Sequence, residues 1–348
     1  MNTAVIFGGT GFIGVHFAKY LLDNNYVDKV YLLDIDPIEA KTSEYRKKLI
    51  RQDLRLIFVK ADVRESLDWF TPNDQVVITA NFAAIHREPG HEDWEYYKTN
   101  LLGAENVCTW AEGVGCDLIV FISSISPYGA SEDLKDERSL PMPITPYGVS
   151  KLVAERIHQI WQARDDSKRR LIIVRPGVVF GPGECGNVTR LIKAVVNRYF
   201  FYMGNKSTRK SGVYVKELCC ATLWVLQRLE NSGEHVILFN MSMNPAPSIQ
   251  DYVNSVCKVV GVKRLILSVP YPLLLTIAYL IELFARPLGL KHPFSPVRVR
   301  KLVRSNNILP HYLIQNGYKY CFSLEAALTD WYLNCPEEWI KHPPHTAN

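Results

Sequence analysis

Tyr147 and Lys151 are four residues apart, the spacing that places two side chains on one face of a helix. A free tyrosine, with a pKa of about 10, is a poor base at neutral pH. A neighbouring ammonium favours the phenolate, which suits the pair to removing a proton from a hydroxyl group. Pro146 is typical of a first helical turn. Tyr128 is also followed by Gly but has no Lys four residues later, and an ordinary surface helix could carry a Tyr and a Lys at this spacing by chance.

Ser124 is a candidate partner for Tyr147. It lies in "FISSIS" (121–126), at the end of an apolar run over 118–122 that is typical of a buried strand. From a strand end, its hydroxyl can hydrogen-bond a reacting oxygen and orient it toward Tyr147. Two adjacent serines are also an ordinary polar strand end, and these residues alone leave that alternative open.

A glycine-rich segment follows the first apolar run of the chain. "FGGTGFIG" (7–14) places Gly8, Gly11 and Gly14 between a strand-like run at 4–7 and a helical pattern. Glycine is needed where the backbone turns tightly, approaches a pyrophosphate, or lets a helix pack closely on a strand. The N-terminus of the following helix offers N–H groups to phosphate oxygens. The spacing predicts a dinucleotide site, although a tight turn without a ligand would use the same glycines.

Asp34 strengthens the dinucleotide prediction. It lies twenty residues after Gly14, at the end of a second apolar run over 30–33. An acidic side chain there accepts hydrogen bonds from the ribose hydroxyls of the adenosine and repels a 2′-phosphate. The position therefore favours NAD over NADP, a preference that Lys41 or Arg46 would weaken.

Asp62 and Val63 follow a third apolar run, at 56–59, and are placed to meet the adenine. Asp62 would equally serve as the N-cap of a helix over 63–70. The two roles do not exclude each other.

The elements that must position these residues are predicted from hydrophobic patterning. Continuous Val- and Ile-rich runs alternate with amphipathic helical patterns, which is typical of a doubly wound parallel sheet of the Rossmann type in an α/β fold. We expect this NAD-binding domain to span 1–176, with returns to the sheet at about 213–241 that include runs at 213–215 and 236–239. A smaller, mostly helical C-terminal cap that binds the substrate is predicted over 177–212 and 242–335, and a frayed tail over 336–348. The six runs of the first domain are 4–7, 30–33, 56–59, 76–79, 118–122 and 171–174.

Composition narrows the class of protein. The chain has 348 residues and a formal net charge of +5, without a stripe of aromatic and basic residues, so nucleic acid is not an expected partner. Eight Cys without a Cys-x-x-Cys pair or Cys/His cluster indicate a reducing compartment and no metal site. No signal peptide is expected, and the default is a cytoplasmic enzyme. The apolar stretch 271–290 is broken by Glu282 and Arg286, which predicts an amphipathic or buried helix, with a membrane-surface or partner contact as the weaker alternative.

With these motifs together, the chain resembles the extended short-chain dehydrogenase/reductase family over essentially its whole length. The closest likeness is to its NAD-dependent epimerase/dehydratase group, which acts on nucleotide sugars. Further segments that carry the resemblance are "NFAA" (81–84), "KTNLLGAENV" (98–107), "RPGVVFGPGE" (175–184), "VYVKEL" (213–218) and "FNMS" (239–242).

The resemblance implies catalytic roles for Ser124, Tyr147 and Lys151, and a structural or substrate-side role for Tyr128. It also implies that NAD is held by Gly8, Gly11, Phe12, Ile13, Gly14, Asp34, Asp62, Val63, Ala83, Ala84, Asn100, Tyr147, Lys151 and Pro176.

Two departures from the family pattern bear on the reaction. Ile125 and Ser126 stand where family dehydratases carry an acidic pair, which argues against dehydration. Val178 stands where many family epimerases have an Asn. In this respect the segment looks more like that of the family's ketoreductases and of its hydroxysteroid-dehydrogenase branch.

The substrate contacts are predicted less sharply. The segment "TRKSGVYV" (208–215) resembles a reductase-like segment that meets the substrate diphosphate, although an exposed basic loop explains it equally well. Guanidinium groups at 298 and 300 could form a second diphosphate clamp. Candidate substrate-binding residues are His86, Ser126, Arg209, Lys210, Ser211 and Arg298.

The expected function is NAD-dependent epimerisation of a nucleotide-activated sugar through a keto-sugar intermediate, in polysaccharide biosynthesis. Tyr147 would take the hydroxyl proton while NAD takes the ring hydride, which then returns to the other face. The alternatives are a nucleotide-sugar ketoreductase of the same family, a hydroxysteroid-dehydrogenase-like oxidoreductase, and a catalytically silent NAD-binding protein. The expected partner is the nucleotide sugar, with no spanning membrane segment, and a homodimer is left open.

Overall fold

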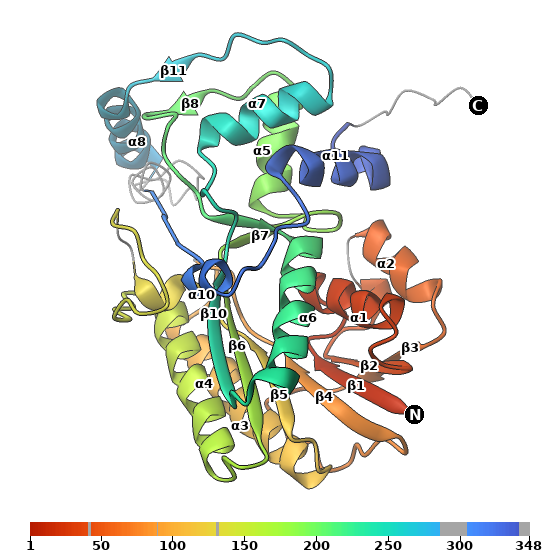
Figure 1. Cartoon of the computed structure of the whole chain (residues 1–348). Coiled ribbons are helices and arrows are strands. Elements are labelled where there is room, and N and C mark those ends of the chain that lie inside the picture. The colour runs from red at the N-terminus through yellow and green to blue at the C-terminus, as the bar shows by residue number, and fades with distance from the viewer. Residues whose placement is uncertain (41–42, 89, 130–131, 286–304, 341–348) are drawn as a thin grey trace, which may run out of the picture.

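A central sheet of seven parallel strands forms the frame of the molecule (Figure 1). The computed structural model describes residues 1–40, 43–88, 90–129, 132–285 and 305–340. The strand order is β10–β6–β5–β4–β1–β2–β3. All six apolar runs predicted in the first domain lie in this sheet, which confirms the Rossmann-type prediction. The strands are β1 (Asn2–Phe7), β2 (Lys29–Asp34), β3 (Leu56–Lys60), β4 (Gln75–Asn81), β5 (Leu118–Ile122), β6 (Arg170–Pro176) and β10 (Val236–Met241).

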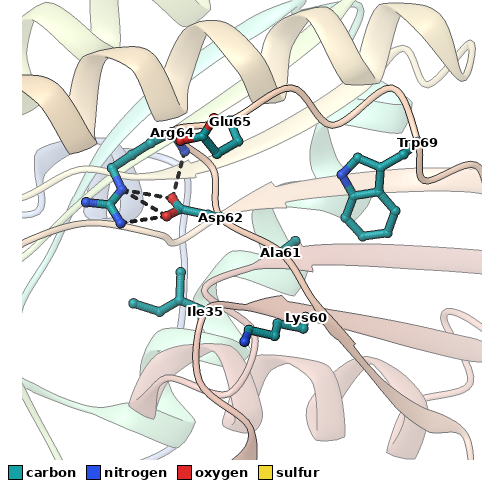
Figure 2. A pocket seen from close by; sticks show the side chains of 7 residues that line it. All are labelled: Ile35, Lys60, Ala61, Asp62, Arg64, Glu65 and Trp69. Atoms are coloured by element: carbon teal, nitrogen blue, oxygen red, sulfur yellow. Dashed lines mark hydrogen bonds and ion pairs between the residues drawn. The ribbon is translucent and has the colours of Figure 1, made fainter.

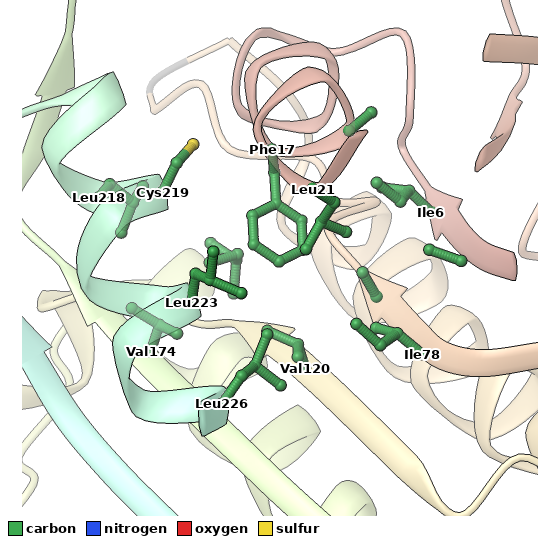
Figure 3. Packing of buried hydrophobic residues seen from close by; sticks show 14 of the residues in the cluster. Ile6, Phe17, Leu21, Ile78, Val120, Val174, Leu218, Cys219, Leu223 and Leu226 are labelled. Atoms are coloured by element: carbon green, nitrogen blue, oxygen red, sulfur yellow. The ribbon is translucent and has the colours of Figure 1, made fainter. Parts of the chain in front are cut away.

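Helices cover both faces of the sheet because alternate strand residues are apolar on each side. Helices α1 (Phe12–Asp23) and α6 (Val215–Ser232) pack on the face that carries Ile6, Ile78 and Val120, as Figure 3 shows. Helices α3 (Asp93–Gly113) and α4 (Pro146–Ala163) cover the opposite face and bury the side chains of Val5, Phe7, Ile119, Phe121 and Ile173.

The strand order reverses at β1, which pairs with β2 on one side and with β4 on the other. Crossovers leave in opposite directions from this point, so a crevice opens at the carboxyl ends of β1 and β4, where ligands of such sheets bind. The segments after these two strands carry the glycine-rich turn and "NFAA", so the topology brings both to one place.

A separate hydrophobic cluster builds the smaller part of the molecule above the sheet (Figure 1). Phe180, Tyr214 and Trp331 lie at its centre. The helices around them are α5 (Asn187–Val196), α7 (Ile249–Val259) and α11 (Leu324–Asn334). The remaining elements are α2 (Glu44–Arg51), α8 (Tyr271–Ala285), α10 (His311–Gln315), the strands β7 (Val178–Phe180), β8 (Tyr202–Met203), β9 (Gly212–Tyr214) and β11 (Ser268–Val269), and the 3-10 turns η1 (Ile38–Ala40), η2 (Ser126–Tyr128) and η3 (Pro336–Glu338).

Of the two runs expected to return to the central sheet, only that at 236–239 does so, as β10. The run at 213–215 was the wrong part of this prediction. It forms β9 and the start of α6, and β9 pairs with β7 in a two-stranded sheet. The reason is that β6 already has β5 on one side and β10 on the other, so the central sheet offers β9 no edge there.

The prediction of a frayed tail over 336–348 is wrong for its first five residues. Trp339 is 1% exposed. The Glu338 carboxylate accepts hydrogen bonds from the Gly183 amide at 3.0 Å and from the Trp331 indole N–H at 2.7 Å. A buried tryptophan and a paired carboxylate outweigh the polar, Pro-rich composition of this segment. Residues 341–348 lie outside the described part of the chain.

Among the helices in the described ranges, none has the length and hydropathy needed to cross a membrane. Helix α8 is the most apolar of them by sequence, and it covers the first fifteen residues of the stretch predicted as an amphipathic or buried helix.

Candidate active site

The glycine-rich turn is shaped by close backbone contacts. Gly8 has φ = +74°, and a Cβ there would lie 2.7 Å from the amide nitrogen of Ala83. A Cβ at Gly14 would lie 2.5 Å from the Gly8 carbonyl oxygen. Helix α1 begins directly after Gly11, which has no side chain to cap the first-turn N–H groups. Those N–H groups are left for an anion, so the turn fits the pyrophosphate of a dinucleotide.

Asp34 ends β2 beside this turn. Its carboxylate accepts hydrogen bonds from the amides of Thr10 at 3.2 Å and Asp36 at 3.4 Å. Arg46 donates from Nη1 to the Thr10 carbonyl at 3.4 Å, so a cation lies near the position where a 2′-phosphate would sit. Asp34 therefore orders the turn itself, in addition to its predicted contact with the ribose.

A cavity of about 360 Å³ lies next to Asp34 (Figure 2). Arg64 donates to both carboxylate oxygens of Asp62, at 2.9 and 2.6 Å, so the charges that face the cavity balance each other. Asp62, which was predicted to meet the adenine, lies in its lining. The lining residues are Ile35, Lys60, Ala61, Asp62, Arg64, Glu65 and Trp69.

The alternative role of Asp62, the N-cap of a helix over 63–70, is wrong. These residues form turns, and the Asp62 side chain accepts the Arg64 amide at 2.9 Å within one of them. Val63 is buried against Gly103, where a Cβ would lie 2.9 Å from the Val63 Cγ2 atom. Asn106 donates to the Val63 carbonyl at 2.8 Å, so helix α3 holds this turn in place.

Helix α4 begins where the predicted triad requires it. Thr145 caps the helix by accepting the Gly148 amide at 3.1 Å. A Cβ at Gly148 would lie 2.8 Å from the Ser126 carbonyl oxygen, so only glycine lets the first turn of α4 approach η2 this closely. The approach brings the Tyr147 phenol near enough to the Ser124 hydroxyl for the serine to favour the ionised phenol. The Ser124 hydroxyl also contacts Ser126, both at its amide and at its hydroxyl, at 3.1 Å.

Lys151 lies one turn further along the same face of α4 and is 3% exposed. Its Nζ donates to the carbonyl of Ile122 at 2.8 Å and lies 4.8 Å from the centroid of the Phe121 ring. Burial lowers the pKa of Lys151 to about 7, against the opposing charge of Glu155. The structure thus gathers Ser124, Tyr147 and Lys151 at the carboxyl end of β5.

The expected lowering of the Tyr147 pKa is absent in the chain by itself. Removal of the phenol from water raises its pKa to about 12, although the hydrogen bond with Ser124 acts in the other direction. A positive charge placed beside the phenol would oppose this shift. A cation bound beside the phenol would therefore favour the phenolate that the predicted role as a base requires.

Glu155, which the sequence analysis missed, holds this arrangement together. Its buried carboxylate accepts hydrogen bonds from the Ser123 hydroxyl at 2.5 Å and from Arg175, Nε at 2.8 Å and Nη2 at 2.6 Å. The Arg175 guanidinium lies 4.7 Å from the ring centroid of Tyr128, which has the predicted structural position. Two signals were available: Glu155 continues the Tyr147 and Lys151 face, and a charge inside the β6 run requires a partner.

Asn100 positions the segment after β4. Its side chain exchanges two hydrogen bonds with the backbone of Ile85, at 2.9 and 3.2 Å, and donates to Ser150 at 2.8 Å. Helix α3 thereby fixes the segment that carries Ala83 and Ala84 against α4. His86 follows in this segment, and the crowding of its ring by neighbouring protein, together with the Lys151 charge, lowers its pKa.

Pro176 ends β6 at the same edge of the sheet, where its carbonyl accepts the Ile125 amide at 3.2 Å. Phe12 and Ile13 open helix α1.

The residues predicted to contact the substrate diphosphate make hydrogen bonds to other parts of the chain. The Ser211 hydroxyl is fully buried, donates to the Asn306 carbonyl at 2.7 Å and accepts the Ile308 amide at 2.9 Å. Arg209 is exposed, and its guanidinium donates to the carbonyl of Ala246. Burial lowers the pKa of Lys210. Ser211 therefore holds the 306–308 segment, the diphosphate role of these residues stays a prediction, and Arg298 lies outside the described residues.

The comparisons with known proteins show the family of this chain. The family model of the NAD dependent epimerase/dehydratase family matches residues 4–240. A doubly wound sheet with a glycine-rich cradle and a Tyr/Lys pair on α4 defines an NAD-dependent enzyme of the extended short-chain dehydrogenase/reductase class. The chain belongs to the NAD-dependent epimerase/dehydratase family, as its sequence motifs indicated.

Individual relatives differ in substrate. An Escherichia coli O157:H7 protein, N-acetyl-alpha-D-glucosaminyl-diphospho-ditrans,octacis-undecaprenol 4-epimerase, is 26% identical over 94% of this chain and 93% of its own. The Candida albicans sterol-4-alpha-carboxylate 3-dehydrogenase, decarboxylating, is 23% identical over 95% and 97%. Among solved structures, the UDP-Glc/GlcNAc 4-epimerase of Campylobacter jejuni has a TM-score of 0.72 at 17% identity and covers 96% of this chain and 100% of its own.

The low pKa of Lys151 predicts a pH-dependent contribution to stability. Below pH 7 the lysine is protonated in both the folded and unfolded chain, whereas between pH 7 and about 10 only the unfolded chain binds the proton, so folding becomes more favourable as the pH rises. The free energy of unfolding of wild type minus that of Lys151→Met should be flat below pH 7 and then rise by about 1.4 kcal/mol per pH unit. Urea titrations of nucleotide-free protein measure it, and a constant difference from pH 7 to 10 would show an ordinary pKa.

The position of Asp34 predicts a preference for NAD(H). NAD(H) should bind at least ~10-fold more tightly than NADP(H), about 1.4 kcal/mol, because the carboxylate repels the 2′-phosphate. Two variants should change this preference in opposite directions. Arg46→Ala should widen the preference for NAD(H), because it removes a nearby cation, and Asp34→Ala should narrow it, because it removes the carboxylate. Calorimetry on the three proteins gives the ratios, and equal affinities in wild type would contradict the role of Asp34.

Proposed function

We propose that this enzyme epimerises a sugar carried on a diphosphate, through a keto-sugar intermediate. The observation that carries the proposal is the meeting of the Tyr147 phenol with the Ser124 hydroxyl and, one turn away, the buried Lys151 ammonium, beside the dinucleotide cradle. The 4-epimerases among its relatives, including UDP-glucose 4-epimerases of Vibrio cholerae and Bacillus subtilis that are each 27% identical over more than half of the chain, support epimerisation over one-way reduction.

The chemistry follows from the positions of these groups. NAD, when bound, supplies a hydride acceptor that can return the hydride. Tyr147, as phenolate, removes the proton of the sugar hydroxyl, and the Ser124 hydroxyl donates a hydrogen bond to the same oxygen. Lys151 in its protonated form stabilises the phenolate. When the hydride returns to the opposite face of the keto sugar, Tyr147 gives the proton back, so the reaction has no net oxidation.

The carrier of the sugar has two candidates. A nucleoside diphosphate is the first, in line with the UDP-sugar epimerases among the relatives and structural neighbours. A polyprenyl diphosphate is the second, favoured by the Escherichia coli relative, which matches nearly the full length of both chains. Ile125 and Ser126 in place of an acidic pair argue against dehydration of either substrate.

We further propose a homodimer through α3 and α4. Two adjacent helices expose apolar side chains: Leu102 on α3, and Val153 and Ile160, two turns apart, on α4. An apolar patch of this kind could pair with the same patch of a second copy in an isologous interface. A reducing compartment, a cytoplasmic location and the absence of a nucleic-acid partner stay predictions.

Tyr147→Phe should reduce turnover by at least ~10²-fold, because it removes the proton acceptor and leaves the ring packing in place. The NAD content of the purified protein should be unchanged. Tyr128→Phe is the matched control, since it removes a buried hydroxyl that donates to Asn240 at 2.8 Å, outside the triad. Steady-state rates decide: a larger loss in Tyr128→Phe than in Tyr147→Phe would reverse the assignment of the base.

Epimerisation predicts many turnovers without added cofactor, because the hydride taken in the first half-reaction is returned in the second. NMR of UDP-glucose, UDP-N-acetylglucosamine and a short-chain polyprenyl diphosphate N-acetylglucosamine, each with the enzyme alone, should show the 4-epimer of one of them. A reaction that consumes NADH stoichiometrically would instead identify the ketoreductase.

A further inference from the structure

Helix α8 exposes an apolar outer face. Leu280 and Leu283 are 50% and 65% exposed, and Leu273 and Ile277 continue the same side at helical spacing. Its inner face is apolar as well and buries Leu274 and Ala278 against Phe201, Met203, Val269 and Tyr271. Ordinary surface helices of globular proteins carry polar residues on the outer face, so α8 departs from that pattern.

The exposed apolar surface continues beyond the helix. Leu265 and Leu267, on the approach to β11, are 94% and 71% exposed. Strand β11 pairs with β8 and leads into α8 through Pro270, so both segments lie at the same outer end of the smaller part of the molecule, away from the central sheet (Figure 1). An apolar surface of this extent marks a contact with a partner or a membrane.

The charge of the chain near this apolar surface indicates what kind of partner it binds. The exposed Lys263 lies two residues before Leu265, and Glu282 is the only acidic residue of α8 as the structure describes it. In the sequence, the segment directly after α8 contains no Asp or Glu and carries Arg286, Lys291, Arg298, Arg300, Lys301 and Arg304. Exposed apolar side chains that are followed in the chain by a cationic sequence match an anionic phospholipid surface, where apolar chains enter the acyl boundary and cations meet the headgroups.

The described part of α8 is shorter than the core of a bilayer is thick. Fifteen residues extend about 22 Å at 1.5 Å per residue, less than the ~30 Å of a bilayer core. Because its inner face is packed against Phe201, Met203 and Val269, α8 presents a single apolar side outward, which suits a helix that lies along a membrane surface.

We propose that α8 and the approach to β11 dock this enzyme on the surface of an anionic phospholipid bilayer. The docked face belongs to the part of the molecule expected to bind the substrate, so a diphosphate sugar anchored in the same bilayer would be presented at the site without leaving the membrane. The docking does not depend on the proposed reaction, although it favours the polyprenyl diphosphate carrier over the nucleoside diphosphate.

The test measures binding of the full chain, with its cofactor retained, to vesicles. The wild type should co-sediment with vesicles of mixed phosphatidylglycerol and phosphatidylcholine. Its binding to vesicles of phosphatidylcholine alone should be at least ~10-fold weaker, and its binding to the mixed vesicles should weaken as salt is raised. Leu280→Glu should reduce binding to the anionic vesicles at least ~10-fold. Leu54→Glu, a matched change at a residue 94% exposed next to β3, should bind like the wild type.

A reporter variant checks the depth of the helix. Tyr279 is half-exposed on α8, and the variant Tyr279→Trp places a tryptophan there. The fluorescence emission of this added tryptophan should shift to the blue when anionic vesicles are added. NAD content and turnover of the water-soluble substrate should be equal in wild type, Leu280→Glu and Leu54→Glu, which separates a failure of docking from a failure of the proposed function.

Three outcomes would overturn the proposal. They are no binding of the wild type to anionic vesicles at low salt, equal loss in Leu280→Glu and Leu54→Glu, and a concentration-dependent dimer that Leu280→Glu abolishes while vesicles are not bound. The last result would identify a second copy of the chain as the occupant of this surface.

Discussion

The buried carboxylate of Glu155 is the interaction on which the active site depends. It joins three elements: Ser123 after β5, Arg175 at the end of β6, and α4, which carries Tyr147 and Lys151. With both partners of the ion pair removed from water, loss of either would leave an uncompensated charge at a cost of about 3–5 kcal/mol. The pair therefore ties the register of α4 to the sheet, and the positions of the phenol and the ammonium follow from that register.

The frame of the fold could be predicted from local patterns. Each strand buried on both faces leaves a continuous apolar run, and the runs at 4–7 and 118–122 lie within β1 and β5. What failed depended on neighbours far along the chain. Whether the run at 213–215 enters the sheet depends on β10 occupying the edge of β6, and whether Trp339 is buried depends on the distant α11. Neither the pairing of the 213–215 run nor the burial of Trp339 can be predicted from the composition of the segment itself.

The same distinction separates the parts of the site. Gly8, Tyr147 and Lys151 were found because their roles need a local backbone shape or a helical spacing. Asn100 and Glu155 act on segments fifteen to twenty residues away or further, so their partners are visible only in three dimensions. Asn100 had been matched to a family motif as a cofactor residue, and its observed contacts make it a support for the segment after β4.

Burial gives the catalytic pair its most informative property. The surroundings that exclude water raise the pKa of Tyr147 and lower that of Lys151, so in the chain alone burial acts against the charged form of both groups. Proton abstraction requires the opposite state, with a phenolate and an ammonium. A positive charge beside the phenol favours that state, and the oxidised nicotinamide ring of a bound NAD would supply one. If Tyr147 is the base, as we propose, occupation of the cofactor site would control its charge state, so that it would act as a base where a hydride acceptor is also present.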